Sequence, residues 1–304
     1  MSTAPERIIR IGTRGSELAL WQANFLQNEL KNVGYSSELV IIKTKGDQIQ
    51  HLSFDKIEGK GFFTKELEDA LLDGTIDMAV HSMKDLPTTQ PEGLIIAGLS
   101  YREDPRDVLV IREKSFDNTQ DLRLIHNAKV GTSSVRRKAQ LLNLRPDLVL
   151  SDIRGNVPTR LEKLRTLDFD AIMLASAGLE RIQPDLSDLK VIPLHPREFV
   201  PAPSQGVLAY QCMEADTEMR RIIQKLHHKD VAEISNIERG ILKGLGGGCQ
   251  TPLGVYCETD ADGFFHTWVA YAKDMSMPVQ NFHYSSNSAK DTIRQILQFL
   301  QDEQ

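Results

Sequence analysis

The chain has 304 residues, of which 40% are apolar and 26% are charged, and its formal net charge at pH 7 is −6. This length predicts two or three domains, each large enough to bury its own core. The negative balance excludes an electrostatic hold on DNA or on an anionic membrane over the whole surface, so any site for an anion must be local.

Three cysteines, Cys212, Cys249 and Cys257, form an odd set without a CxxC pair. This pattern argues against a disulfide framework and against a zinc site, and we expect no bound metal. The N-terminus lacks the apolar core of a signal peptide, and no apolar run approaches the roughly 18 residues of a membrane span. We therefore expect a cytoplasmic protein.

The first predicted strand, residues 8–11, leads into the turn Gly12-Thr13-Arg14-Gly15-Ser16. A helix is predicted next, with one face formed by Leu18, Trp21, Phe25 and Leu30. Ser16 can cap this helix, and the free N–H groups of a helix N-terminus attract anions, so Arg14 lies in a candidate anion site. Such turns are common in α/β folds, and this one is weak evidence by itself.

A second strand is predicted at residues 38–44, and the long polar segment 45–61 after it is typical of a mobile lid. Thr64 can cap a helix that stops at Gly74, and residues 78–81 are predicted to form a buried strand.

Lys84 and Asp85 come directly after that buried strand, and Pro87 follows them. Ligands of open α/β sheets bind beyond the carboxyl ends of the strands, so both residues are candidates for chemistry. The alternative interpretation is a solvated Lys-Asp turn closed by the proline.

The N-terminal strand-and-turn pattern recurs at Lys129-Val130-Gly131-Thr132-Ser133-Ser134, and Arg136 and Arg137 open the following helix. Basic residues are unfavourable for the dipole at a helix N-terminus and invite an anionic partner. The recurrence predicts two lobes of similar build that face one cleft. The proline-bearing segment 193–203 and a strand near 205–210 predict a return to the first lobe.

Basic residues follow several predicted strand ends or open helices, although the protein is acidic overall. Any one arginine is more often a surface ion-pair partner, but the set favours a cleft for a polyanion. The set comprises Arg14, Lys84, Arg136, Arg137, Arg154, Arg160 and Arg181.

The C-terminal part begins with a helical pattern at residues 216–245, and a glycine-dense loop then presents Cys249. Three strands and a final helix are predicted near Val255 and at 265–271, 279–283 and 289–300. We expect a discontinuous first lobe, a second lobe and a smaller α+β domain. Their predicted bounds are 1–100 with 198–217, 101–197 and 218–304.

Five separated motifs resemble those of the porphobilinogen deaminase family, whose members are also called hydroxymethylbilane synthases. They occur in the family's order over nearly the whole chain, which is a specific signal where any one motif is weak. The motifs are Gly12-Thr13-Arg14-Gly15-Ser16 with 18–23, His81-Ser82-Met83-Lys84-Asp85-Leu86-Pro87, Gly131-Thr132-Ser133-Ser134-Val135-Arg136-Arg137, Arg154-Gly155-Asn156-Val157 and Gly247-Gly248-Cys249-Gln250.

This resemblance implies an α/β transferase of tetrapyrrole (haem) biosynthesis. Its fold has two periplasmic-binding-protein-like βα lobes around a cleft plus a smaller α+β C-terminal domain. Such enzymes condense four porphobilinogen molecules onto a covalent dipyrromethane cofactor, lose ammonia at each addition, and release hydroxymethylbilane by hydrolysis. The implied ligands are porphobilinogen and polypyrrole intermediates, with no nucleic acid or membrane partner. A monomer that passes its product to the next pathway enzyme is also implied.

The resemblance also implies residue roles. Cys249 holds the dipyrromethane through a thioether, and Asp85 is the catalytic carboxylate and a cofactor contact. Further cofactor contacts fall on Lys84, Ser133, Ser134, Arg136 and Arg137. Substrate contacts fall on Arg14, Ser16, Thr132, Arg154, Arg160 and Arg181, and on Lys56 and Lys60 in the mobile loop. Glu58 and Pro158 depart from the family's usual residues, and Pro158 is compatible with a first helical turn.

The implied chemistry suits Asp85, because loss of ammonia from an aminomethylpyrrole leaves an electron-poor cation that a fixed anion stabilises. The competing interpretation is a non-catalytic two-lobed module for an anionic ligand, which would not need Cys249. We interpret Cys212, Cys257, His81, His227 and His228 as structural.

Overall fold

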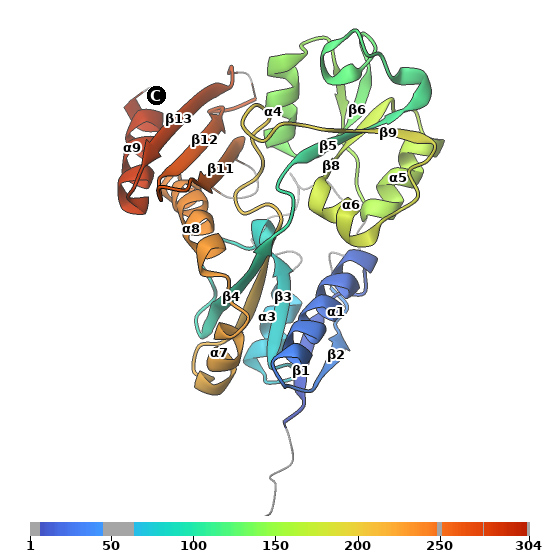
Figure 1. The fold of residues 1–304 in the computed structure, drawn as a ribbon. Helices are drawn as coiled ribbons and strands as arrows, with labels where there is room; N and C mark the ends of the chain where they lie inside the picture. The colour runs from blue at the N-terminus through green and yellow to red at the C-terminus, as the bar shows by residue number, and fades with distance from the viewer. Residues whose placement is uncertain (1–6, 45–63, 248–250, 276, 303–304) are drawn as a thin grey trace, which may run out of the picture. The chain divides into compact units, whose positions relative to one another are not determined.

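The computed structural model describes residues 7–44, 64–247, 251–275 and 277–302. These residues form two compact units, one spanning 1–102 with 207–231 and the other spanning 103–206 with 232–304 (Figure 1). The predicted lid at 45–61, with Lys56 and Lys60, and the predicted anchor Cys249 lie outside the described residues.

The first unit is built on a five-stranded sheet with the order β2-β1-β3-β10-β4. Strand β1 pairs in parallel with β2 and β3, whereas β10 pairs antiparallel with β3 and β4. The chain therefore returns to this sheet late, as the sequence predicts. The strands are β1 Ile9–Thr13, β2 Ser37–Ile41, β3 Met78–Ser82, β4 Leu94–Arg102 and β10 Val207–Met213.

Helices cover both faces of this sheet. Helices α1 and α7 pack on one face through Leu26 and Ile223, and α3 packs on the other through Leu71. Their bounds are α1 Glu17–Asn32, α3 Lys65–Leu72 and α7 Thr217–Gln224, and the 3-10 turn η2 covers Met83–Asp85.

Three local predictions for this unit have different outcomes. Ser16 caps α1 as predicted, because its side chain accepts a hydrogen bond from the Ala19 N–H. Thr64 precedes α3 but makes no capping hydrogen bond, so that prediction is wrong. The buried face of α1 is also rotated from the predicted one, because Gln22 points inward to bond Ser82 while Trp21 stays half-buried.

The second unit contains a five-stranded sheet with the order β7-β6-β8-β5-β9. Here β6 pairs in parallel with β7 and β8, and β5 pairs antiparallel with β8 and β9, so the pattern of the first sheet is repeated. This repetition confirms two lobes of similar build. The strands are β5 Asp107–Arg112, β6 Lys129–Gly131, β7 Val149–Ser151, β8 Ala171–Ala175 and β9 Leu189–Pro193.

Helices again cover both faces of the second sheet. Leu141 of α4 packs on one face, and Leu161 of α5 and Leu179 of α6 pack on the other. The bounds are α4 Val135–Leu144, α5 Val157–Thr166 and α6 Ser176–Ile182, with 3-10 turns η3 at Glu113–Ser115 and η4 at Asp121–Arg123.

The same unit holds an antiparallel sheet with the order β11-β12-β13, which packs one face on α8 and α9 (Figure 1). This is the smaller α+β part that the sequence predicts, whereas the division into three domains stays a prediction. The bounds are α8 Lys229–Gly244, β11 Leu253–Thr259, β12 Phe265–Tyr271, β13 Gln280–Ser286 and α9 Ala289–Asp302.

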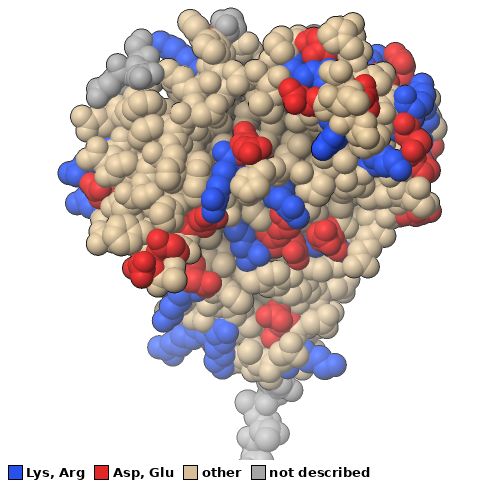
Figure 2. Space-filling view, turned by 45° about the horizontal axis from the view of Figure 1, so that its top comes forward, with Lys and Arg blue, Asp and Glu red and all other residues tan. Residues whose placement is uncertain are grey.

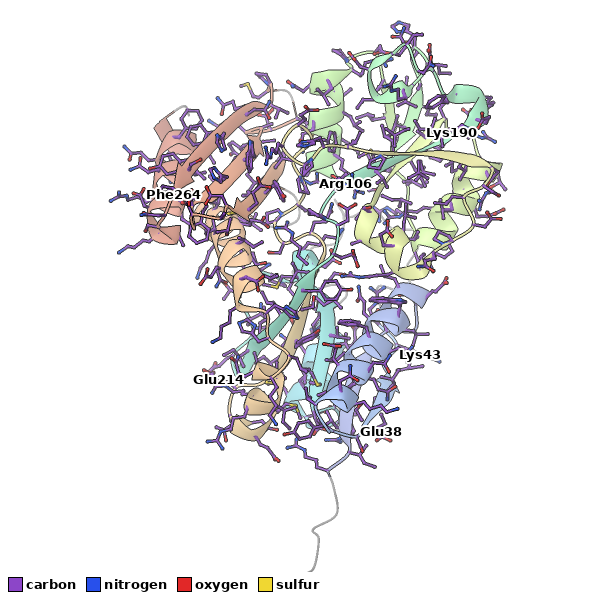
Figure 3. The ribbon with its side chains drawn as sticks, viewed as in Figure 1. Glu38, Lys43, Arg106, Lys190, Glu214 and Phe264 are labelled. Carbon is purple, nitrogen blue, oxygen red and sulfur yellow. The ribbon has the colours of Figure 1, made fainter. Side chains whose placement is uncertain are left out.

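Two chain segments at the edge of the second unit, 103–106 and 203–206, are tied to each other. The Glu103 N–H donates to the Gly206 carbonyl at 3.1 Å, and Gln205 Nε2 donates to the Pro105 carbonyl at 2.7 Å. Arg106, labelled in Figure 3, pairs with Asp104 at 2.8 Å just before β5 begins. These segments adjoin two of the three points at which the chain passes from one unit to the other, at residues 102–103 and 206–207, and the third point is at residues 231–232.

Basic and acidic side chains are interspersed on the face shown in Figure 2. No helix within the described parts of the chain is both long and apolar enough to cross a membrane.

Candidate functional site

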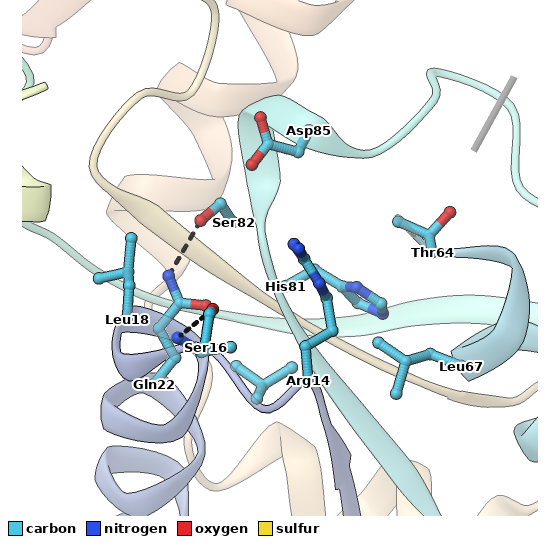
Figure 4. Close-up of a pocket in the computed structure, with 11 residues that line it drawn as sticks. Arg14, Ser16, Leu18, Gln22, Thr64, Leu67, His81, Ser82 and Asp85 are labelled. Carbon is cyan, nitrogen blue, oxygen red and sulfur yellow. Dashed lines mark hydrogen bonds between the residues drawn. The ribbon is translucent and has the colours of Figure 1, made fainter. Parts of the chain in front are cut away.

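The first unit has a pocket beyond the carboxyl ends of β1 and β3, where ligands of open α/β sheets bind. The turn after β1, the start of α1 and η2 after β3 supply most of its wall (Figure 4). The lining residues are Arg14, Ser16, Leu18, Ala19, Gln22, Thr64, Leu67, Val80, His81, Ser82 and Asp85.

Arg14, Ser16 and Asp85, three of the residues singled out from the sequence, share this pocket. Figure 4 shows the Arg14 side chain and the Asp85 carboxylate reaching into the same space from two different elements. Asp85 is exposed, and among the described residues no side-chain hydrogen bond or ion pair holds its carboxylate. A cationic and an anionic side chain therefore line the same pocket.

The pocket also contains polar residues that the sequence interpretation missed. Gln22 is buried and donates from Nε2 to Ser82 Oγ at 2.9 Å (Figure 4). A glutamine on the apolar face of an amphipathic helix is the signal that could have identified it, since a buried amide needs a partner.

His81, interpreted from the sequence as structural, also lines the pocket. Burial lowers the pKa of His81, the hydrogen bond to Gln211 opposes the change and the charge of Arg14 adds to it, so that the pKa is about 4. The imidazole is therefore neutral near pH 7.

Glu68 is a second buried group near Gln211. Burial raises the pKa of its carboxyl, and interactions with Thr64 and Gln211 oppose the change.

A second group of predicted residues meets in the second unit around Asp107 at the start of β5. Arg136 Nη1 donates to Asp107 Oδ2 at 2.6 Å and to the Val200 carbonyl at 2.9 Å. Arg137 donates to Asp107 Oδ1 from Nε at 3.1 Å and from Nη2 at 2.7 Å. Sequence reasoning did not single out Asp107.

This cluster is buried, with Asp107, Arg136 and Arg137 exposed by 0%, 5% and 6%. Burial opposes ionisation of Asp107, but the two guanidinium groups outweigh it and hold the pKa of that carboxyl well below its usual range. Burial lowers the pKa of Arg136 and Asp107 opposes the change, yet a guanidinium stays protonated in proteins. Two cations against one anion leave a buried net positive charge, which favours an anionic ligand.

Three hydroxyl side chains lie at the N-terminus of α4, the helix that carries Arg136 and Arg137. Ser134 caps the helix by accepting from the Arg137 N–H at 3.4 Å, and Thr132 Oγ1 accepts from the Ser134 N–H at 3.3 Å. Ser133 Oγ donates to the Ile153 carbonyl at 3.0 Å.

Arg154 and Arg160 flank the turn between β7 and α5. Asn156 caps α5, Pro158 lies in its first turn as predicted, and Arg160 Nε donates to the Gly155 carbonyl at 2.7 Å. Gly155 has φ +113°, and a Cβ there would lie 2.6 Å from the Thr159 side chain, so glycine is required.

Arg181 and the two described cysteines are buried. Arg181, on α6, donates from Nη2 to the Gly206 carbonyl at 2.7 Å. Burial raises the pKa of the Cys212 thiol to about 11, and Cys257 is fully buried, so both suit a structural interpretation.

Comparison with known proteins identifies the family. Residues 9–221 match the family described as porphobilinogen deaminase, dipyromethane cofactor binding domain. The chain belongs to the porphobilinogen deaminase family. The match includes the Asp85 pocket and the Asp107–Arg136–Arg137 cluster, and it ends at residue 221, within α7.

Several curated porphobilinogen deaminases are similar to the chain over most of their length. The Maridesulfovibrio salexigens protein is 44% identical over 276 residues, which cover 90% of this chain and 88% of that one. The Syntrophotalea carbinolica protein is 46% identical over 250 residues, covering 82% and 78%. The Moorella thermoacetica protein is 47% identical over 247 residues, covering 81% and 77%.

Two solved structures with a partial likeness are the BvgS periplasmic VFT2 domain and the methionine binding protein MetQ. The Bordetella pertussis BvgS periplasmic VFT2 domain is 12% identical with a TM-score of 0.45, covering 76% of this chain and 93% of that one. The methionine binding protein MetQ is 14% identical with a TM-score of 0.44, covering 75% and 93%. TM-scores below 0.5 do not by themselves establish a common fold, and the strand orders above define the two lobes.

The cofactor of porphobilinogen deaminases is the dipyrromethane named for the matched domain. The residues of the second unit fit an acidic group of this kind, because the Asp107–Arg136–Arg137 cluster is buried with a net positive charge beside a helix N-terminus. Of the predicted contacts, Cys249 lies outside the described residues.

Proposed function

We propose that this protein is a hydroxymethylbilane synthase that condenses four porphobilinogen molecules, with loss of ammonia at each addition, and releases the linear tetrapyrrole by hydrolysis. The observation that carries this proposal is the family match over residues 9–221, within which Asp85 and Arg14 share one pocket.

Asp85 is the proposed catalytic residue. Its exposed carboxylate can approach the ring nitrogen of an incoming pyrrole, where it stabilises the positive charge that develops as ammonia leaves. The same oxygen atoms can take up the proton that the ring carbon loses after bond formation. Arg14 in the same pocket can hold a substrate carboxylate, so that the reacting end is oriented toward Asp85.

The cofactor contacts are proposed to be Lys84, Asp85, Ser133, Ser134, Arg136 and Arg137, with Cys249 as the thioether anchor. When bound, the dipyrromethane supplies the pyrrole carbon to which the first substrate unit is joined. Arg136 and Arg137 keep guanidinium N–H groups beyond those used on Asp107 and the Val200 and Met173 carbonyls, since each guanidinium carries five. These donors can bind cofactor carboxylates in a fixed orientation.

Substrate carboxylates are proposed to bind residues that provide cationic or hydroxyl donors. Arginine suits this role because its planar fork orients a carboxylate and is not lost to deprotonation. The proposed residues are Arg14, Ser16, Thr132, Arg154, Arg160 and Arg181, with Lys56 and Lys60 outside the described residues.

We further propose a monomeric cytoplasmic protein of three domains that passes its product to the next enzyme of the pathway.

Two experiments test the proposed function. In the first, the intact mass of the purified protein should exceed the sequence mass by one dipyrromethane, and Cys249→Ser should remove that excess. In the second, the purified protein should consume porphobilinogen and release ammonia.

A bare-chain mass in protein purified without cofactor loss, together with no turnover, would contradict the proposal. That combination would favour the alternative function, a non-catalytic two-lobed module that binds an anionic ligand.

A further inference from the structure

The segment that carries Asp85 has its two ends joined through one side chain, Gln211 on β10. His81 Nε2 lies 3.1 Å from Gln211 Oε1, and Gln211 Nε2 donates to Gln90 Oε1 at 2.8 Å. Gln90 Nε2 in turn donates to the Pro87 carbonyl at 2.9 Å. This hydrogen-bond relay begins before Asp85 in the sequence and ends after it.

The Pro87 carbonyl sets the direction of every bond in the relay. A carbonyl oxygen can only accept, so Gln90 must turn its NH₂ group to Pro87 and its oxygen to Gln211. Gln211 must then give its NH₂ group to Gln90 and present its oxygen to the imidazole. That oxygen also can only accept, so His81 carries its proton on Nε2 and keeps Nδ1 as an acceptor.

Burial keeps water away from the hydrogen bond between His81 and Gln211. Gln211 is 0% exposed and His81 is 6% exposed, so water does not replace a lost bond. A polar interaction with Gln211 also lowers the pKa of Glu68 against the larger effect of burial, which raises it. Arg14 is the charged group among the described residues that acts on the ring.

Asp85 itself lies in the three-residue turn η2, and among the described residues no side-chain bond holds its carboxylate. Its position therefore depends on how the two ends of the segment are held. We propose that Gln211 is a positioning residue for Asp85, because it fixes the segment at His81 on one side and, through Gln90, at Pro87 on the other. This inference rests on the proposed catalytic role of Asp85.

The kinetic test replaces the amide with an apolar group of similar size, in Gln211→Leu. A displaced Asp85 should lower kcat by roughly 10- to 100-fold with little change in KM, since small misplacements of a reacting group have effects of this size. The covalent cofactor mass should be unchanged. A folded Gln211→Leu enzyme with kcat within about twofold of wild type would overturn the proposal.

The matched control is Gln27→Leu. Gln27 is also in the first unit and donates from Nε2 to the Ser37 carbonyl at 2.8 Å, at the opposite end of the sheet. Its loss should lower the melting temperature without changing kcat. An equal fall of kcat in Gln27→Leu would show that general destabilisation explains the effect, and would overturn the positioning role.

A second measurement is independent of turnover and uses Gln90→Leu, at the half-buried end of the relay, in case Gln211→Leu does not fold. Nitrogen-15 NMR of wild-type protein should show the Nε2–H tautomer of His81. The carboxyl carbon-13 shift of Asp85 should change in Gln90→Leu and stay unchanged in Gln27→Leu. An Nδ1–H tautomer, or an unchanged Asp85 shift, would overturn the relay. A wild-type protein without turnover would instead contradict the proposed function and leave this readout intact.

Discussion

Asp85 in the first unit and Asp107 in the second are the same residue type in opposite surroundings. Asp85 is exposed in a pocket, and among the described residues nothing holds its carboxylate. Asp107 is fully buried and accepts hydrogen bonds from Arg136, Arg137 and Gln205. The first carboxylate can meet a ligand, whereas the second has its oxygen atoms occupied by the protein.

The difference shows that one unit presents an exposed carboxylate to a ligand, whereas the other uses a buried carboxylate to hold two arginines. Asp85 lies in a segment whose two ends are joined through Gln211 and Gln90. A carboxylate that holds two arginines must be buried and fully bonded, because an unpaired buried charge is costly. Substitution of Asp85 should therefore lower turnover, whereas substitution of Asp107 should lower the free energy of unfolding.

Asp85→Asn should cause the largest loss. Removing a carboxylate that exchanges protons and stabilises developing charge should lower kcat by about 100-fold or more. Because Asp85 is exposed, the melting temperature and the cofactor mass should stay close to those of wild type. Steady-state turnover of porphobilinogen measures the first effect and calorimetry the second. Near-normal turnover would remove Asp85 from the catalytic role.

Asp107→Asn should act on stability first. Two buried guanidinium groups would lose their counter-charge, which costs about 3–5 kcal/mol in the free energy of unfolding. The matched control is Asp188→Asn, where the exposed pair with Arg165 at 2.7 Å contributes about 0–1 kcal/mol. Urea unfolding of both variants measures the difference. Equal losses would mean that burial of Asp107 does not set its role.

The contributions of His81 and Asp107 to stability should be lost over different pH ranges. His81 has a pKa near 4 in the folded protein and 6.5 as a free group, so the unfolded chain binds more protons between these values. Stability from His81 is therefore complete above pH 6.5 and falls by about 3 kcal/mol as the pH drops toward 4. The pKa of Asp107 is lowered, so its contribution is present above 3.8 and is lost below that pH.

The check is urea unfolding of wild type and His81→Asn between pH 4 and pH 7. The variant should show a flatter dependence of unfolding free energy on pH over this window. A slope identical to that of wild type would mean that His81 is already protonated in the folded protein or is not buried.

Gly254→Ala should have the smallest effect of the set. A Cβ at Gly254 would lie 2.4 Å from the Val200 carbonyl oxygen, which also accepts from Arg136 Nη1. Displacing this backbone should cost about 1–3 kcal/mol in the free energy of unfolding. In the control Gly178→Ala, the new Cβ would meet Val157 at 3.7 Å, an ordinary contact, and helix α6 should gain up to about 1 kcal/mol. Thermal unfolding compares the pair, and a neutral Gly254→Ala would contradict the close approach.

The amino-acid pattern is enough to predict the α/β class, the repeated turns and the positions of the sequence motifs. Periodicity and glycine spacing act locally, so the turn at Gly12–Ser16 and its Ser16 cap could be predicted without the fold. The same applies to the segment with Lys84 and Asp85 after a buried strand, and to Pro158 in the first turn of α5. Five motifs in the family's order carry the resemblance, and none of them depends on a tertiary contact.

Tertiary structure alone decided which polar groups pair. Asp107 lies 29 residues before Arg136, and Gln211 lies 130 residues after His81, so no local pattern connects them. Gln22 lies on the buried face of α1, but only the fold shows that its partner is Ser82, 60 residues later in the sequence. Burial fixed the protonation of His81 and the environment of Asp107, because desolvation depends on everything packed around a group rather than on its neighbours in sequence.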